Sequence, residues 1–287
     1  MLAPSSLASA DVMDRYWRPE LRIVPARHAA GEDEVPASGH ITFSPTVRSH
    51  PVAPPAPPPL PPRVIPWSYE GEGAPEHWAG LKPEFALCGK GLRQSPVDMG
   101  DAIAVDLMPA DFHYVASPLH LRDDGHTLRA ALSGSVLAVN GRHFTLDELH
   151  VHRPAEEVVK GVSHDLGIHL VHHDAEGHAA IVAVLMDRGE ANPLIQTLLN
   201  HLPLESDAPV DLQEVLIDPT LLLPEDRRYY STLGSLTEPP CTEGVLWLVL
   251  RQPMTISEEQ LNIFKRLHGP NARPLQPING RVMLGPH

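Results

Sequence analysis

Hydrophobic and polar residues alternate along several short segments between residues 127 and 251. A period of two is typical of antiparallel strands that bury one face. Turn-forming sequences such as Asp123-Asp124-Gly125 and Asn140-Gly141 separate these segments. The pattern predicts strands over residues 127–132, 136–139, 148–152, 167–172, 180–185 and 245–251.

Two helices are indicated by their N-terminal caps. Asn192 followed by a proline is an N-cap with a first-turn proline, which predicts a helix over residues 194–202. The sequence Ser257-Glu258-Glu259-Gln260 is a capping box, and Ile256 and Leu261 are placed to form a hydrophobic staple around it. Strands and helices together predict one β-rich domain with a few peripheral helices.

The first 66 residues differ in composition from the rest of the chain. Nine of the sixteen residues from position 51 to position 66 are proline, which favours a stiff, extended polyproline conformation. Residues 1–20 lack the basic start and the apolar block of a secretory signal. We therefore predict a proline-rich, disordered leader or linker over residues 1–66 and a folded domain over residues 67–287.

Composition and charge narrow the choice of partners. The chain has 287 residues, of which 42% are hydrophobic, so a normal buried core is feasible. Its formal net charge of -14 argues against nucleic acid or an anionic membrane as a main partner, because both attract basic surfaces. No apolar run approaches the roughly 18 residues that a membrane-spanning helix needs.

The two cysteines, Cys88 and Cys241, lie far apart in the sequence. They are compatible with inert thiols, with part of a metal site or with one disulfide. Spacing alone does not decide between these, because the two sulfur atoms must meet in space.

Three histidines are candidates for a metal site. His150 and His152 are two residues apart on a predicted strand, so both imidazoles point to the same face. His169 lies on the next predicted strand and completes a three-nitrogen site if the two strands are neighbours. Three neutral imidazoles with one open position are the arrangement of a catalytic zinc ion.

Other interpretations of these histidines have to be weighed. The chain has 18 histidines, so a pair with one residue between arises easily by chance. His150, His152 and Glu156 also resemble the first motif of cupins, in which two histidines and a carboxylate hold iron or manganese. Glu156 would then be a metal ligand. The proline-glycine-histidine motif that cupins carry further along is not found here.

Six motifs follow one another between residue 67 and residue 281. They are Trp67-Ser-Tyr69-Glu-Gly71 with Pro75-Glu-His-Trp78, Gln94-Ser95-Pro96-Val97-Asp98, His150-Val-His152-Arg-Pro-Ala-Glu156-Glu157, His169-Leu-Val171-His172, Ser235-Leu-Thr237-Glu-Pro239-Pro240-Cys241-Thr-Glu-Gly244-Val245-Leu-Trp247, and Asn271-Ala-Arg273-Pro274-Leu-Gln276 with Asn279-Gly-Arg281. In these motifs and in their order the chain resembles α-class carbonic anhydrases of the bacterial type.

This resemblance implies a fold and an activity. The expected fold is mainly β, a single domain on a large, twisted, mostly antiparallel central sheet of about ten strands with short peripheral helices. The expected activity is reversible hydration of carbon dioxide to bicarbonate and a proton by a zinc enzyme. A non-catalytic relative that keeps the fold and acts as a binding protein is the alternative. We expect a small-molecule substrate and no nucleic-acid partner, and we leave a homodimer open.

The resemblance also implies a role for individual residues. His150, His152 and His169 match the zinc ligands. Thr237 matches the threonine that accepts a hydrogen bond from the reacting hydroxide, and Glu156 matches the glutamate that receives the threonine's own hydrogen. The proton path to solvent is matched by His126 and Tyr69, and the apolar wall of the substrate pocket is matched by Val171, Ile181, Leu236, Val245 and Trp247.

Cys88 and Cys241 match a pair that forms a disulfide in many bacterial members of the family. A disulfide implies an oxidising compartment. We therefore expect a periplasmic or secreted protein, although the missing signal in the first residues favours the cytoplasm.

The chain departs from the family at three positions near the metal ligands. Gly167 stands where the family has the carboxylate that orients the third ligand, so another acceptor or water serves His169, or zinc is held more loosely. Glu148 stands where a glutamine supports the first ligand, and its charge compensates in part by making His150 more basic. Glu238 replaces a threonine after Thr237, where it would repel bicarbonate.

Overall fold

The computed structural model describes residues 64–206 and 208–287. The leader predicted over residues 1–66 lies almost entirely outside the described residues, so its disorder and the boundary at residue 66 stay predictions.

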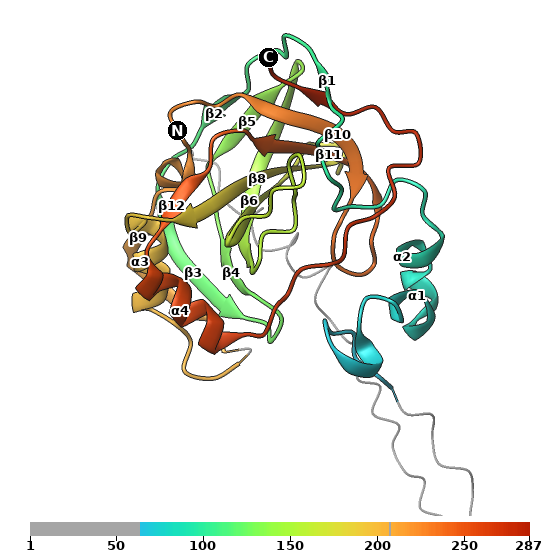
Figure 1. Cartoon of the computed structure of the whole chain (residues 1–287). Helices are drawn as coiled ribbons and strands as arrows, with labels where there is room; N and C mark the ends of the chain where they lie inside the picture. Colours follow the sequence, from blue (N-terminus) through green and yellow to red (C-terminus); the bar gives the residue numbers. More distant parts are fainter. Residues whose placement is uncertain (1–63, 207) are drawn as a thin grey trace, which may run out of the picture. The chain divides into compact units, whose positions relative to one another are not determined.

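Thirteen strands form one sheet in the described part of the chain (Figure 1). Ten of them follow one another side by side, in the order β1 (Ile103–Ala104), β13 (Leu284–Gly285), β10 (Tyr229–Ser235), β11 (Glu243–Leu250), β8 (Ala179–Arg188), β7 (Leu166–His173), β6 (Arg142–His152), β4 (Leu128–Ala131), β3 (Ser117–Asp123) and β9 (Val210–Ile217). The other three pair beside this row, and they are β2 (Asp111–His113), β5 (Val136–Val139) and β12 (Met254–Ile256).

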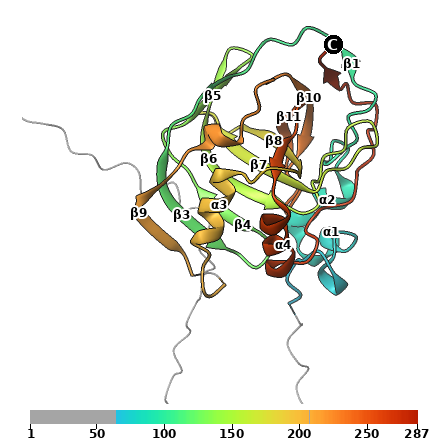
Figure 2. The same cartoon turned by 60° about the vertical axis from the view of Figure 1, so that its left-hand side comes forward.

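Most neighbouring strands are antiparallel, as predicted, but the sheet is mixed. The pairs β1 with β13, β11 with β8 and β12 with β8 are parallel. The predicted strand over residues 136–139 agrees with β5, and the predicted strand over residues 148–152 is the second half of the longer β6. The prediction of a mainly β fold on one large, twisted sheet is confirmed (Figure 2).

The helices are few and short. They are α1 (Trp78–Leu81), α2 (Leu87–Lys90), α3 (Pro193–Asn200) and α4 (Glu258–Leu267), with 3-10 turns at Gly71–Gly73, Pro83–Phe85 and Pro219–Leu222. Both predicted caps are present, since Asn192 accepts hydrogen bonds from two amides of the first turn of α3 and Ser257 and Gln260 form the capping box of α4. The helix α3 ends at Asn200, two residues earlier than predicted, because Pro203 disfavours helical backbone before it.

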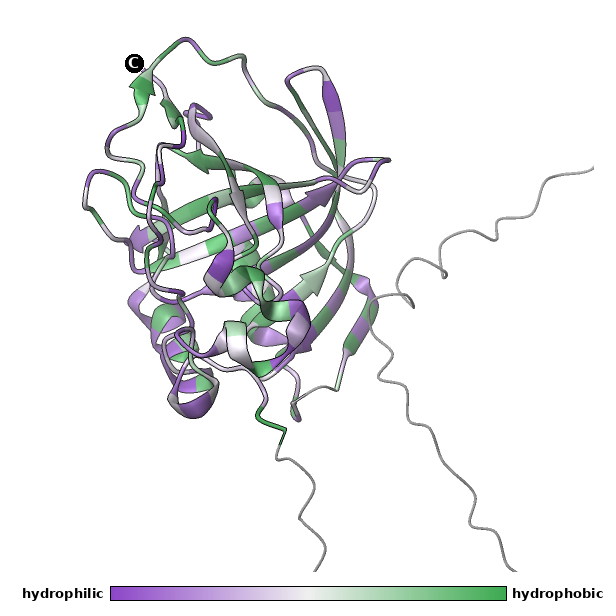
Figure 3. Cartoon of the chain, turned by 90° about the vertical axis from the view of Figure 1, so that its right-hand side faces the viewer, coloured by the Kyte–Doolittle hydropathy of each residue, from purple (hydrophilic) through white to green (hydrophobic). Residues whose placement is uncertain are grey.

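The sheet is buried on both faces at its centre, where every residue of β7 except His173 is buried. One face packs against α3 and α4 in a large cluster of apolar side chains, and hydrophobic stretches run along the strands in Figure 3. The other face carries a smaller cluster around Trp247 together with buried polar residues. His169 lies on this second face, because it is two residues from Val171, which belongs to the smaller cluster.

Cys88 in α2 and Cys241 form a disulfide. Among the three possibilities for these cysteines, the disulfide is therefore confirmed. Both cysteines pack with Trp78 and Phe85 in a separate small cluster. No helix in the described ranges is both long and apolar enough to cross a membrane.

Candidate metal centre

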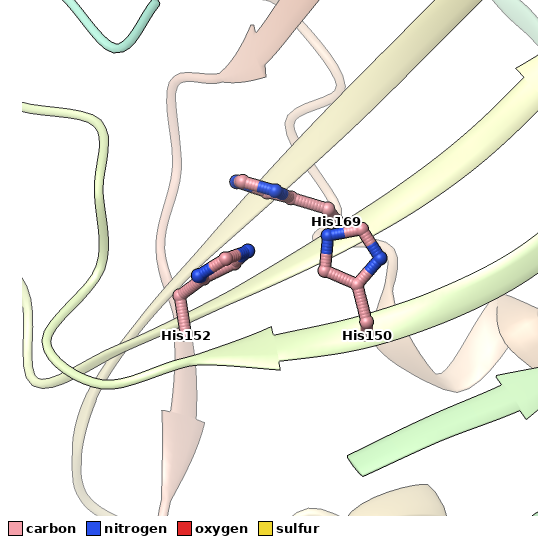
Figure 4. A group of neighbouring side chains, drawn as sticks. All are labelled: His150, His152 and His169. Carbon is pink, nitrogen blue, oxygen red and sulfur yellow. The ribbon is translucent and has the colours of Figure 1, made fainter. Parts of the chain in front are cut away.

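Three buried histidines on two neighbouring strands face one another (Figure 4). His150 and His152 lie two residues apart on β6, so both rings point to the same side of the sheet. His169 on β7 is paired directly with His150 in the antiparallel register. One nitrogen of each ring lies within 4.8 Å of the others, so the predicted trio converges in space.

Hydrogen bonds fix which nitrogen is free in two of the three rings. His152 Nδ1 lies 2.8 Å from the Asn271 carbonyl and His169 Nε2 lies 2.9 Å from Glu157 Oε1, so each of these nitrogens carries the hydrogen. The lone pairs therefore remain on His152 Nε2 and His169 Nδ1. His150 Nδ1 lies between the acceptor Glu148 Oε1 at 3.0 Å and the donor Arg129 Nη1 at 3.1 Å.

Both lone-pair nitrogens, His152 Nε2 and His169 Nδ1, are buried and have no hydrogen-bond partner. An unpaired buried nitrogen costs free energy, so two of them at one point indicate a missing ligand. Burial lowers the pKa of His150 and His152 well below the usual value, which keeps both rings neutral. Three imidazole nitrogens are a donor set that catalytic zinc takes, so these residues fit a zinc ion.

His169 differs from the other two histidines in its charge environment. Burial opposes protonation of the ring, but the Glu157 carboxylate outweighs burial and raises the pKa of His169. The same contact lowers the pKa of Glu157 against the effect of its own burial. Gly167 has no side chain that could accept a hydrogen bond from His169, and Glu157 is the residue that accepts it instead.

Glu156 lies beside the three nitrogens with its side chain fully buried. Its Oε1 accepts a hydrogen bond of 2.7 Å from the Arg273 amide. Its Oε2 has no partner and lies 3.6 Å from His152 Nε2 and 4.0 Å from His169 Nδ1. Burial raises the pKa of Glu156 to about 8, although the hydroxyl of the buried Thr237 acts in the opposite direction. The Thr237 hydroxyl is thus near enough to Glu156 to favour its ionised form.

An apolar surface adjoins His169. The indole ring of Trp247 lies 5.0 Å from the imidazole of His169, measured between ring centroids. Trp247 belongs to the same cluster as three other residues predicted for the pocket wall, with Leu236 packed against it. Those three are Val171, Ile181 and Val245. The five residues predicted from the resemblance are thus brought together beside one ligand candidate.

His126 and Tyr69 are neighbours, with ring centroids 6.5 Å apart. The ring of His126 stacks on Trp67, with centroids 3.7 Å apart and an angle of 16° between the planes. The backbone amide of His126 donates to Asp124 Oδ1 at 2.9 Å, which holds the turn that carries it. Tyr69 donates a long hydrogen bond of 3.4 Å to Glu238, and burial, followed by the Glu238 charge, raises the pKa of Tyr69.

Sequence reasoning missed Arg129, which connects several of these groups. It lies on β4 directly opposite His150 and its side chain is 15% exposed. The guanidinium binds Asp124 at 2.6 Å, Glu148 at 2.7 Å and Glu238. Glu238 is therefore paired with a cation, a partner that the sequence did not indicate. The sequence offered one signal for this role, because Arg129 is a charged residue within the predicted strand 127–132, two residues after Thr127 and so on the same face.

Asn271 was also missed as a functional residue, although its motif was noted. Its carbonyl accepts from His152, and its side-chain nitrogen donates to the carbonyls of His126 and Val151 at 3.1 and 2.8 Å. One asparagine thus ties a metal-ligand candidate to the turn that carries His126.

The chain is similar in sequence and fold to several known proteins. The model of the eukaryotic-type carbonic anhydrase family matches residues 73–285. A carbonic anhydrase of Klebsiella pneumoniae is 40% identical over 222 residues, covering 76% of this chain and 90% of that protein. The solved structure of the Photobacterium profundum alpha-carbonic anhydrase is 40% identical with a TM-score of 0.72, covering 76% of this chain and all of that one (100%). Dioscorin dioA3 of Dioscorea japonica is 35% identical over 220 residues, covering 73% of this chain and 81% of that protein.

Proposed function

Because the chain belongs to the carbonic anhydrase family, we propose that it hydrates carbon dioxide reversibly to bicarbonate and a proton, with zinc held by His150, His152 and His169. The observation that carries this proposal is the convergence of one nitrogen from each of three imidazoles, two of these nitrogens being buried without a partner. Family membership also removes the cupin interpretation, in which Glu156 was a metal ligand.

Zinc would supply the nucleophile and a positive charge. When bound, it lowers the pKa of water to about 7, the value known for carbonic anhydrases, and its charge favours the ionised form of Glu156. Every other task in the reaction belongs to the residues of the chain.

Glu156 and Thr237 orient the reacting hydroxide. An ionised Glu156 accepts the hydroxyl hydrogen of Thr237, so the Thr237 oxygen is left to accept a hydrogen bond from the hydroxide. This arrangement turns a lone pair of the hydroxide toward the apolar wall. The support is the position of Glu156 beside His152 and His169, together with the effect of the buried Thr237 hydroxyl on the Glu156 carboxylate.

The apolar wall collects the substrate. Carbon dioxide is apolar, so a surface made of Val171, Ile181, Leu236, Val245 and Trp247 is chemically suited to it. Bicarbonate is charged and gains nothing from such a surface, which favours its release.

Proton transfer to solvent is assigned to His126, with Tyr69 in the hydrogen-bonded path. An imidazole can accept a proton at one ring nitrogen and release a proton from the other, so a histidine is chemically suited to this task. The stacking of His126 on Trp67 keeps the ring within the same part of the molecule as Tyr69.

The decisive experiment combines zinc analysis with stopped-flow hydration on the purified protein. We expect about one zinc per chain and rapid hydration of carbon dioxide. Zinc bound without hydration would favour the alternative, a binding protein of the same family. A protein that takes up no zinc, although all three histidines are intact, would contradict the proposal itself.

We also propose a periplasmic or secreted location. The support is the Cys88–Cys241 disulfide, because disulfides persist in oxidising compartments. A thiol reagent applied to the unreduced protein should label no cysteine, and labelling of both would argue for the cytoplasm. A homodimer remains a prediction.

A further inference from the structure

The carboxylate that holds His169 comes from a loop and not from the strand that carries the histidine. Glu157 lies five residues after the end of β6, and both of its oxygens approach His169 Nε2, at 2.9 and 3.1 Å. The His169 side chain is fully buried and that of Glu157 is 3% exposed. Since a carboxylate only accepts, Nε2 carries the hydrogen and Nδ1 keeps the lone pair.

Gly167 explains why the strand does not supply this carboxylate. It lies two residues before His169, on the same face of β7. A Cβ atom at position 167 would lie 3.2 Å from both Cα and Cβ of Ala155. The loop that carries Glu157 therefore runs through the space that a side chain at position 167 would need.

Glu157 is also unlike the acceptors of the other two histidines. His152 donates to a neutral backbone carbonyl of Asn271. Glu148, the acceptor of His150, is 31% exposed and shares its charge with Arg129. Glu157 is a buried anion held against a ring whose opposite nitrogen has no partner.

We propose that Glu157 is the positioning residue for His169, and that Gly167 and Glu157 form a pair in which the missing side chain of one admits the carboxylate of the other. Glu157 fixes the tautomer of His169 and makes its Nδ1 a stronger donor. The statement about metal binding rests on the proposed zinc site, whereas the statement about the tautomer does not. Contacts of this kind change metal affinity by about 10–100-fold.

Zinc affinity of graded variants tests the proposal. Glu157→Gln keeps the volume and an acceptor oxygen but removes the charge, and Glu157→Leu removes the acceptor. We expect zinc dissociation constants, measured by competition with a chelator, to rise by about 10-fold and about 100-fold respectively. Circular dichroism should match that of the wild type.

The matched control is Asp147→Asn. Asp147 lies 2.6 Å from His173 Nδ1 on the same strand as His169, but both side chains are about half exposed, at 48% and 45%, and neither is a ligand candidate. We expect its zinc affinity to equal that of the wild type. Equal zinc affinity of the wild type and both Glu157 variants would overturn the proposal.

A second measurement is independent of zinc. In the metal-free, ¹⁵N-labelled protein, we expect a protected Nε2–H resonance for His169 that shifts in Glu157→Gln and disappears in Glu157→Leu. A wild type that binds no zinc would refute the proposed function, and this resonance would then decide alone whether Glu157 positions His169. Its absence from the wild type would overturn the tautomer assignment.

Discussion

His169 and His172 lie three residues apart on β7, and both are fully buried, yet their surroundings differ in kind. His172 faces the large apolar core, where Tyr114 Oη lies 2.8 Å from its Nε2 and its Nδ1 donates to the Ala180 carbonyl at 3.3 Å. His169 faces the site, where only its Nε2 has a partner. Burial therefore does not mark a functional histidine, whereas an unpaired nitrogen among other unpaired nitrogens does.

The two faces of β7 extend this difference beyond the histidines. On the core face, Leu166, Ile168 and Leu170 pack in the large apolar cluster. On the site face, Gly167 leaves room for a loop and Val171 belongs to the pocket wall. One face of β7 thus packs in the apolar core, and the other face carries residues of the candidate metal centre.

The strongest test of the comparison is to remove each histidine in turn. His169→Ala loses one of three donors, and we expect loss of zinc and a fall in hydration rate beyond the roughly 10–100-fold caused by changes around a ligand. His172→Asn should keep its zinc, as measured by metal analysis after dialysis. Full zinc occupancy in His169→Ala would show that His169 is not a ligand.

Acidification should destabilise the folded protein through His172, the buried histidine on the core face. Burial lowers the pKa of His172 to about 4. In the unfolded chain His172 is protonated near pH 6.5, and in the folded chain only near pH 4. The contribution of neutral His172 to the free energy of unfolding is therefore fully present above pH 6.5. It is lost as the pH falls from 6.5 to 4, by about 3 kcal/mol in the free energy of unfolding.

Denaturant unfolding at several pH values measures this effect. The difference between the wild type and His172→Asn should shrink steadily over that range. A difference that stays constant from pH 7 to pH 4 would contradict the assignment to His172.

At the candidate metal centre, a variant should lose the orientation of the reacting hydroxide without losing zinc. Thr237→Ala removes the hydroxyl that connects Glu156 to the reacting hydroxide, and we expect hydration to slow by about 100-fold. Zinc content should not change, because Thr237 is not a ligand candidate. Stopped-flow rates per bound zinc test this, and an unchanged rate would remove Thr237 from the mechanism.

The smallest effect is expected from the hydroxyl that satisfies His172. Tyr114→Phe leaves His172 Nε2 buried without a partner, which should lower the free energy of unfolding by about 1–3 kcal/mol. Zinc affinity should be unaffected. Tyr69→Phe is the matched control, since its hydrogen bond is long at 3.4 Å and its loss should cost less stability.

Much of the fold could be predicted because its signals are local. The alternation that defines β5 and the capping residues Asn192 and Ser257 act between positions a few residues apart. Strand β10, with Tyr229–Ser235, was not predicted, since its pairing with β11 and β13 comes from distant parts of the chain. The parallel pairing of β11 with β8 was hidden for the same reason.

The sequence by itself determined that His150 and His152 share a face, because successive side chains of a strand alternate. It also offered His169, Glu156 and Thr237 through their motifs. Only the tertiary structure decided that Glu157 accepts from His169 and that Arg129 pairs with Glu238. These contacts join residues on separate loops and strands, and the distance between them is set by the packing of the whole sheet, which no local pattern encodes.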